Sequence, residues 1–319
     1  MINLLRNSLE IIFKRSTLTF FSCIKNILKS ELLRLFLGDR YYLRNIYDFK
    51  MFLNNQDKGI SRSLILFGKR EEDQKLILNK ILKANMNVFD IGANIGYYVL
   101  IENQILKSTG KILAIEPNKE NVELLKRNII LNKIEKKRIY IEESGVSNKS
   151  VKQTFYLAKQ SNLHTFHPTG SAKRFLSGNT INVKTVTISE LSKKYFKPDL
   201  IRMDVEGHEV EILQSLIKDV RNNNLNPLIC FEPHISCYNK SHDITPVLSK
   251  LFCLGYKTKY ISSNAESGTK RIEMVTDKNA IHILKSDGEK RSIFENINAE
   301  NTIKILTKVG GAQTVLLSK

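Results

Sequence analysis

The sequence predicts a doubly wound α/β fold built on a mostly parallel β-sheet, and three observations support this prediction. From residue 76 onward, short apolar runs alternate with segments of helical periodicity, a pattern typical of parallel strands with helices on both faces of the sheet. A glycine-containing turn follows the first apolar run, and acidic residues stand where several runs end. In such sheets ligands bind beyond the carboxyl ends of the strands, so the site is expected there.

The expected elements follow one another closely along the chain. Apolar residues at helical spacing predict the helices, and short apolar runs predict the strands. Helices are expected at residues 75–86, 95–107, 118–133 and 209–217, and strands at residues 88–91, 111–117, 138–146, 151–158, 200–203, 226–232 and 314–319. The polar and charged segment 261–312 is expected to be an insertion before the last strand.

The composition is that of an ordinary folded protein with an excess of positive charge. Of the 319 residues, 42% are hydrophobic and 26% are charged, which excludes a wholly disordered chain. Fifty basic and 32 acidic residues give a net charge of +18, which favours anionic partners such as RNA, a membrane surface or phosphorylated substrates. The basic residues are scattered, so the charge does not choose among them. The four cysteines form no CxxC pair, which predicts a reducing, cytoplasmic compartment and no structural metal.

The N-terminal part of the chain is expected to precede the main domain. Residues 1–37 read as an amphipathic helical extension, and residues 38–85 as an entry segment that packs on the core. No uncharged stretch in residues 4–37 reaches the roughly 18 residues that span a bilayer. Two interpretations remain: helices packed on the main domain, which we favour, or an amphipathic anchor making peripheral contact with an anionic membrane.

The first candidate site residues lie in the turn after the first strand, in the segment DIGANIG at residues 90–96. Gly92 permits a tight turn with a close backbone approach, and Gly96 lets the next helix pack near the strand. The run is shorter than the GxGxxG fingerprint of pyrophosphate binding, which makes a nicotinamide dehydrogenase the weaker interpretation. The Asp90 carboxylate instead suits a cationic ligand such as a sulfonium cofactor. The alternative for both glycines is a simple tight turn.

A second acidic residue, Glu116, stands at the end of the next strand. A carboxylate there can accept hydrogen bonds from both hydroxyls of a ribose. Pro117 and Asn118 turn the chain into its helix, with Asn118 as the expected N-cap. Together with the glycine turn, Glu116 predicts an S-adenosyl-L-methionine site. Taken alone, it could equally be a solvated acid at a helix entry.

Two later strand ends carry the candidate catalytic residues. Asp204 and Glu206 follow an apolar strand, and His234 follows another. A histidine is the usual general base near neutral pH, so His234, Asp204 or Glu206 could remove a proton from a hydroxyl acceptor. For His234 the alternative is a histidine fixed by a backbone hydrogen bond in a loop. A divalent metal at Asp204, Glu206 and Glu232 is conceivable, but no metal site is predicted.

Two neighbouring residues are expected to have ordinary structural roles. His208 is read as a solvated histidine at the start of a helix, and Glu209 as an acid that favours the dipole of the helix's first turn.

These segments resemble the FkbM-type family of S-adenosylmethionine-dependent methyltransferases. The resemblance rests on VFDIGANIGYY, AIEPNKENVELLKRNI, ESGVSN and LIRMDVEGHEVEIL and runs from about Gly68 to His234. It implies a class I, Rossmann-like methyltransferase fold over residues 86–319. The residues expected to hold the cofactor are Asp90, Gly92, Ala93, Asn94, Gly96, Tyr97, Glu116, Pro117, Asn118, Glu143 and Ser144, with Glu143 and Ser144 near the adenine.

The resemblance also implies the reaction. We expect methyl transfer to an acceptor, most often a hydroxyl oxygen of a sugar, glycan or other small molecule. The loop at residues 159–179 is expected to face the acceptor, with Asn162, His164 and His167 as contacts, although an ordinary polar surface loop is an equal interpretation. Two alternatives remain: an RNA methyltransferase, suggested by the charge, and a binding module without catalysis on the same fold.

Overall fold

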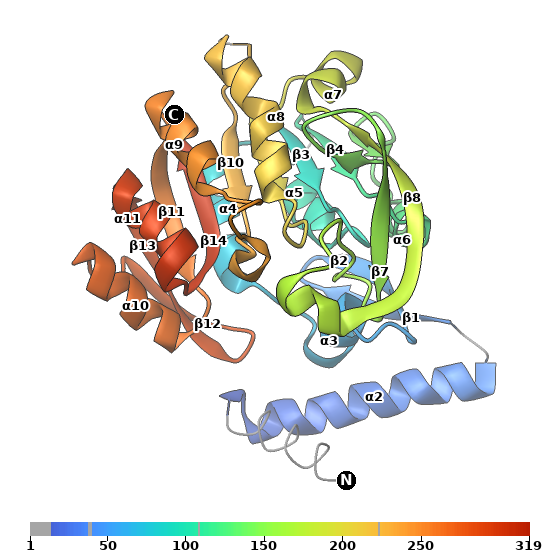
Figure 1. The fold of residues 1–319 in the computed structure, drawn as a ribbon. Coiled ribbons are helices and arrows are strands. Elements are labelled where there is room, and N and C mark those ends of the chain that lie inside the picture. Colours follow the sequence, from blue (N-terminus) through green and yellow to red (C-terminus); the bar gives the residue numbers. More distant parts are fainter. Residues whose placement is uncertain (1–13, 38–39, 108, 223) are drawn as a thin grey trace.

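The computed structural model describes residues 14–37, 40–107, 109–222 and 224–319, and its main feature is one large β-sheet (Figure 1). From edge to edge the sheet contains β12 (His282–Ser286), β13 (Glu289–Ile297), β11 (Lys257–Ser263), β14 (Ala312–Ser318), β10 (Leu228–Phe231), β9 (Leu200–Met203), β3 (Asn87–Ile91), β4 (Lys111–Ile115) and β5 (Ile139–Glu142). Strands β10, β9, β3, β4 and β5 are parallel neighbours. Strand β14 is antiparallel to both neighbours, and β13 is antiparallel to β11 and β12. The strands other than β13 and β14 therefore all run in one direction.

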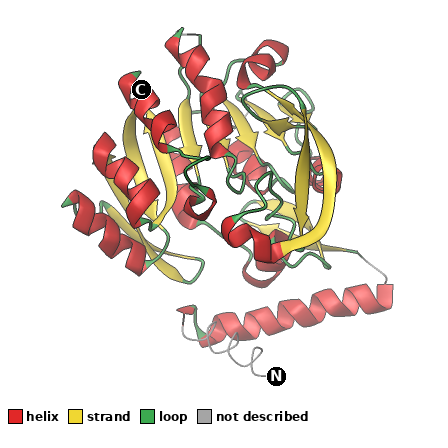
Figure 2. Cartoon of the chain, in the orientation of Figure 1, coloured by secondary structure: helices red, strands yellow, loops and turns green. Residues whose placement is uncertain are grey.

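Helices cover both faces of this sheet (Figure 2). One face packs on α4 (Glu72–Ile81), α5 (Tyr97–Leu106) and α6 (Lys119–Leu131), and the other on α7 (Ile188–Lys194), α8 (Glu209–Arg221) and α9 (Thr245–Cys253). Neighbouring residues of one strand belong to opposite cores: Phe89 faces the second helix layer and Val88 the first. Such two-sided burial explains why the parallel strands are continuous apolar runs. The predicted doubly wound α/β fold is confirmed.

The segment before the sheet packs on the first helix layer. It contains a hairpin of β1 (Tyr41–Ile46) and β2 (Phe49–Asn54), followed by α3 (Ile60–Phe67) and α4. Buried residues of the hairpin, among them Met51 and Leu53, belong to the same core as Val88. Helix α6 begins at the expected N-cap, because the Asn118 side chain accepts a hydrogen bond from the backbone N–H of Asn121.

The long N-terminal helix α2 (Thr17–Leu37) has one packed face and one exposed face. It packs against α3 and buries Cys23 and Ser30. Large apolar side chains on its other face remain exposed: Leu18, Phe21, Leu28, Leu32, Leu35 and Phe36. Residues 1–13 of the expected extension lie outside the described residues. Among the helices of the described ranges, none has the length and apolar character needed to cross a bilayer.

Two further segments complete the fold. The expected insertion at residues 261–312 contributes α10 (Glu266–Thr276), β12, β13 and α11 (Ala299–Lys304), followed by the short η3 (Ile305–Val309), and so widens the sheet at one edge. A small second sheet of β6 (Gly145–Val146), β8 (Leu176–Val186) and β7 (Lys152–Ala158) stands beside the carboxyl end of β5. The loop between β7 and β8 contains the 3₁₀ turn η1 (Gly170–Phe175), and part of this loop lines the cavity described next.

Candidate active site

A cavity opens beyond the carboxyl ends of β3, β4 and β9. It encloses about 800 Å³ of empty space, its open mouth included. Among the residues predicted for the site, those that line it are Gly92, Ala93, Asn94, Tyr97, Glu116, Pro117, Ser144, Asp204 and Glu206. The others lie beneath it or to its side: Asp90, Gly96, Asn118, Glu143 and His234.

Glu116 is held in place by the turn after β3 and by the start of α6. Its Oε2 accepts a hydrogen bond from the Asn94 backbone N–H at 3.0 Å, and its Oε1 accepts one from the Asn118 N–H at 2.9 Å. Burial raises the pKa of Glu116 to about 7, although these N–H donors oppose the shift. The side chain is therefore fixed at the cavity wall, and its oxygens keep further lone pairs for a ligand.

The turn after β3 requires glycine for steric reasons. Gly92 has a φ of +80°, and a Cβ atom there would lie 2.1 Å from the Asp204 backbone oxygen. Gly96 has a φ of +90° and lies against Leu125 of α6, where a Cβ atom would approach to 2.6 Å. Both glycines therefore allow close packing, Gly92 of the β3 and β9 ends and Gly96 of two helices.

Asp90 is fully buried below the cavity and pairs with Arg202 of β9. The Arg202 guanidinium lies 3.0 Å from Asp90 Oδ1 and 3.3 Å from Asp204 Oδ2, and it stacks 3.9 Å from the Tyr98 ring centroid. Burial raises the pKa of Asp90, and the nearby Arg202 charge opposes this. Asp90 thus acts on the cavity through Arg202, whose guanidinium lines it.

The predicted catalytic residues meet at the end of β9. His234 Nε2 lies 3.3 Å from Glu206 Oε2 and 3.8 Å from Asp204 Oδ1, and its Nδ1 lies 2.7 Å from Glu209 Oε1. Burial alone would lower the pKa of His234, but Glu206 and Glu209 outweigh it and raise this pKa well above its usual value. His234 is therefore an imidazolium at neutral pH. Burial, followed by the nearby Asp204 carboxylate, raises the pKa of Glu232 well above its usual range.

Asp204 lines the cavity, as Glu206 does, and its pKa lies near neutrality. Burial raises its pKa to about 6, with Arg202 and then His234 opposing the shift. At pH 7 most of the molecules therefore carry an ionised Asp204 whose proton affinity is higher than that of an ordinary aspartate.

Part of the β7–β8 loop covers one side of the cavity. Ser161, Asn162 and His164 line it, and Ser161 is anchored by hydrogen bonds from its backbone N–H and its hydroxyl to Asp57, at 3.1 and 2.9 Å. Burial lowers the pKa of His164 to about 4, so this side chain is neutral. His167, the third residue expected to contact the acceptor, lies outside the cavity lining and contacts His208 instead.

Of the two predictions about the start of α8, the one for His208 was wrong and the one for Glu209 was confirmed. His208, expected to be solvated, is 3% exposed and lines the cavity wall. Glu209 is in the first turn of α8, as expected, but it is fully buried and accepts a hydrogen bond from the Tyr238 hydroxyl in addition to pairing with His234. The β10–α9 connection, which carries His234 and Tyr238, packs against this turn and explains the burial.

The structure also adds site residues that the sequence reasoning missed. Arg202, Glu71 and Tyr98 line the cavity, and the Tyr98 hydroxyl donates to Glu71 at 2.8 Å. A signal for Arg202 existed, since a charged residue in the middle of the apolar strand LIRM must have a buried partner. Glu71 and Tyr98 gave no comparable signal.

The comparison with protein-family models decides the family. The model described as the methyltransferase FkbM domain matches residues 90–258, more than half of the chain. The chain belongs to the FkbM methyltransferase family. The predicted family is therefore confirmed.

Relatives of this FkbM chain include one curated protein. The hexuronic acid methyltransferase AglP of Haloferax volcanii is 24% identical over 187 residues, which are 56% of this chain and 68% of AglP. Among solved structures, methyltransferase FkbM from Methylobacillus flagellatus is 14% identical, with a TM-score of 0.39 over 60% of this chain and 45% of that one. Fibrillarin from Aeropyrum pernix, solved with natively bound S-adenosyl-L-methionine, is 9% identical with a TM-score of 0.37 over 78% and 74%. This chain spans less than half the length of the Methylobacillus protein.

Proposed function

We propose that this FkbM-family chain transfers a methyl group from S-adenosyl-L-methionine to a hydroxyl oxygen of a sugar, glycan or other small molecule. The observation that carries the proposal is that Glu116 and Asp204 line one cavity at the ends of strands in the same parallel block. The first suits a ribose, and the second suits the proton of an attacking hydroxyl.

The cavity's donor set fits this cofactor. The Glu116 carboxylate, fixed by two backbone N–H groups, would accept hydrogen bonds from the ribose hydroxyls, and the turn of Gly92, Ala93 and Asn94 lines the wall where the amino-acid end would lie. Ser144, buried after β5, would lie near the adenine. When bound, the cofactor supplies a methyl group activated by a sulfonium.

Among the predicted bases, we assign proton removal to Asp204. His234 already carries a proton, held between Glu206 and Glu209, and it does not line the cavity. Asp204 would accept the hydroxyl proton at a carboxylate oxygen while Arg202 restricts its orientation. Holding the acceptor oxygen beside this carboxylate, with water excluded by the β7–β8 loop, contributes through proximity as well as through base catalysis.

Two tests address the cofactor and the reaction separately. Titration calorimetry of S-adenosyl-L-methionine into the full chain should show binding, and Glu116→Gln should weaken it at least tenfold. Glu120→Gln is the matched control, because Glu120 is exposed in the first turn of α6. Absence of binding to the unmodified chain, or equal binding by Glu116→Gln, would refute the proposed cofactor site.

The acceptor class is tested by transfer of a labelled methyl group. AglP is by name a hexuronic acid methyltransferase, which supports a sugar acceptor here, so uronic acids and hydroxylated glycans come first. RNA is the competing acceptor because of the net charge of +18. Methylation of RNA that weakens steeply with added salt would contradict the sugar proposal. Cofactor binding without transfer to any of these acceptors would favour a non-catalytic module.

We also propose peripheral contact between α2 and an anionic membrane. The exposed apolar face of α2 also carries the exposed Lys25 and Lys29, which suits an interfacial helix on an anionic surface. The described cysteines are free thiols, which supports the expected cytoplasmic compartment. In co-sedimentation with phosphatidylserine-rich vesicles, Leu32→Glu should reduce binding, and Ile130→Glu, at an exposed site on α6, should not. Equal sedimentation of both variants would contradict this contact.

A further inference from the structure

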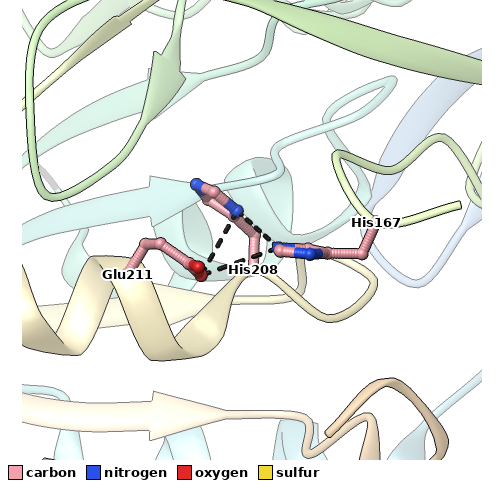
Figure 3. A group of neighbouring side chains, drawn as sticks. All are labelled: His167, His208 and Glu211. Atoms are coloured by element: carbon pink, nitrogen blue, oxygen red, sulfur yellow. Dashed lines mark hydrogen bonds and ion pairs between the residues drawn. The ribbon is translucent and has the colours of Figure 1, made fainter. Parts of the chain in front are cut away.

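Three metal-ligating side chains from two distant segments face one another beside the cavity (Figure 3). His167 lies in the β7–β8 loop, whereas His208 and Glu211 lie at the start of α8, three residues apart on the same side of the helix. None of the three has a role in the proposed methyl transfer, so what this cluster does is a separate question.

The three facing atoms form a triangle of the size that a small divalent ion requires. His167 Nε2 lies 2.9 Å from His208 Nδ1, and Glu211 Oε2 lies 3.6 Å from the former and 3.4 Å from the latter. The point in their plane that is equidistant from all three is about 1.9 Å from each atom. An ion slightly above this plane reaches the roughly 2.0–2.2 Å that Zn²⁺ keeps from imidazole nitrogen and carboxylate oxygen.

A neighbouring hydroxyl group favours the form of His208 that can bind an ion. His208 Nε2 lies 3.1 Å from the Ser147 hydroxyl, and with the hydrogen on Nε2, Nδ1 presents a lone pair to the triangle.

Glu211 is oriented by a third histidine. His242 Nε2 donates to the Gly207 carbonyl at 2.7 Å, and His242 Nδ1 lies 3.2 Å from Glu211 Oε1. The other oxygen, Glu211 Oε2, is buried and has no hydrogen-bond partner within the described part of the chain. A buried carboxylate oxygen without a donor is costly, and it points at the centre of the triangle. An ion there would satisfy it.

We propose that His167, His208 and Glu211 bind a divalent transition-metal ion of the zinc class, with solvent in the fourth position. Two imidazoles and one carboxylate are borderline-soft donors, which suit Zn²⁺ better than the all-oxygen sites of Mg²⁺ or Ca²⁺. The His167 and Glu211 side chains are 22% and 20% exposed, so an ion can enter from solvent. Bound there, it fastens the loop that covers the cavity to the helix that follows the catalytic strand.

A second cluster, Asp204, Glu206 and His234, is the competing site in this region. There His234 already pairs with Glu209 through Nδ1 and with Glu206 through Nε2. An ion would have to displace a proton that two carboxylates stabilise. At the triangle an ion replaces only the hydrogen bond between His167 Nε2 and His208 Nδ1, and the displaced proton moves to His167 Nδ1 without leaving a carboxylate-stabilised imidazolium, which is why we favour it.

The proposal is tested by calorimetric titration of Zn²⁺ into the full chain after chelator treatment and dialysis. We expect one ion per chain and an affinity at least tenfold weaker in both His167→Gln and Glu211→Gln. His282→Gln is the matched control, because His282 is an exposed histidine on the edge strand β12. The thermal midpoint without metal should be nearly unchanged in His167→Gln, whose side chain lies in a loop. Added Zn²⁺ should raise the midpoint of the unmodified chain and of His282→Gln, but not that of His167→Gln or Glu211→Gln.

The opposite results are equally clear. No Zn²⁺ binding by the unmodified chain, or equal affinity in His167→Gln, would overturn the proposal. Loss of binding in Glu206→Gln with full binding in His167→Gln would place the ion at the competing cluster and overturn it as well. None of these outcomes depends on S-adenosyl-L-methionine binding, so the proposed function can fail independently.

Discussion

Replacing Arg202 with methionine tests whether the buried ion pair beneath the cavity is essential for stability. Arg202 is 3% exposed and Asp90 is fully buried, with 3.0 Å between the guanidinium and the carboxylate. Methionine keeps much of the apolar contact with the Tyr98 ring but removes the charge. The substitution leaves Asp90 with no compensating charge in a site whose burial already raises its pKa.

The expected loss is about 3–5 kcal/mol in the free energy of unfolding. A buried carboxylate that loses its partner typically costs this much, because its desolvation is no longer offset. Coulomb's law gives a similar energy: two unit charges about 4 Å apart attract by about 4 kcal/mol at an effective dielectric constant of 20. The loss should also grow with pH. Without Arg202 the folded-state pKa of Asp90 rises further above its unfolded value, so stability falls as pH increases through the interval between them.

Urea denaturation at pH 5 and pH 8 measures both effects. Lys126→Met is the control, because it breaks the exposed pair with Glu123 and should change stability by less than about 1 kcal/mol. Adding Asp90→Asn to Arg202→Met should recover part of the loss, since it removes the uncompensated charge. If Arg202→Met alone costs less than about 1 kcal/mol, or if Asp90→Asn deepens the loss, the pair does not have the role assigned here.

Three further predictions concern the cavity. Gly92→Ala should destabilise the chain by about 2 kcal/mol or more in urea denaturation and abolish S-adenosyl-L-methionine binding, because the new Cβ atom would lie 2.1 Å from the Asp204 carbonyl oxygen at a φ of +80°; a fully stable variant would contradict the crowding. Asp204→Asn should lower the rate of methyl transfer about 10²–10⁴-fold, and the unmodified enzyme should lose about tenfold between its plateau and pH 5, because the pKa of Asp204 is about 6 and only the ionised form accepts a proton; a flat pH–rate profile would exclude Asp204 as the base. Asp57→Ala should raise KM for the cofactor several-fold with a smaller effect on kcat, because it releases the Ser161 segment of the loop; an unchanged KM would show that this anchor does not position the loop.

The parallel core could be predicted from sequence because its signal is local. Each strand is an apolar run ended by glycine or acid, and each helix shows its own periodicity. The β12–β13 hairpin was missed and its segment taken for an insertion. Strand β12 lies at the sheet edge and is mostly exposed, and β13 buries polar side chains such as Arg291 and Ser292, so neither strand is a plain apolar run. The exposed face of α2 could not be predicted either, because the sequence pattern of an apolar helix face is the same whether or not another element covers that face.

The site residues show the same difference between local sequence signals and long-range contacts. Gly92, Glu116 and Asp204 stand at strand ends, where topology alone brings side chains together, and all three line the cavity. Asp90 was expected in contact with the cofactor, yet its partner Arg202 lies 112 residues away, and no local pattern shows which side of a strand a charged side chain faces. The contact between His167 and His208 could not be predicted from local sequence either, because it depends on the conformation of a long loop.

The connection from β9 to α8 explains how one short segment serves two different groups of side chains. Glu206 has a φ of +50° and Gly207 a φ of +104°, so the chain reverses sharply there. Asp204 and Glu206, before the reversal, are directed to the cavity, while Glu211, after it, is directed to the histidines of the loop and of the β10–α9 connection. At Gly207 a Cβ atom would lie 2.7 Å from the Cβ of Cys237, so the reversal depends on a residue without a side chain. The proposed proton acceptor and the proposed metal site are therefore positioned by the same turn, and an ion that tightened one would limit the motion of the other.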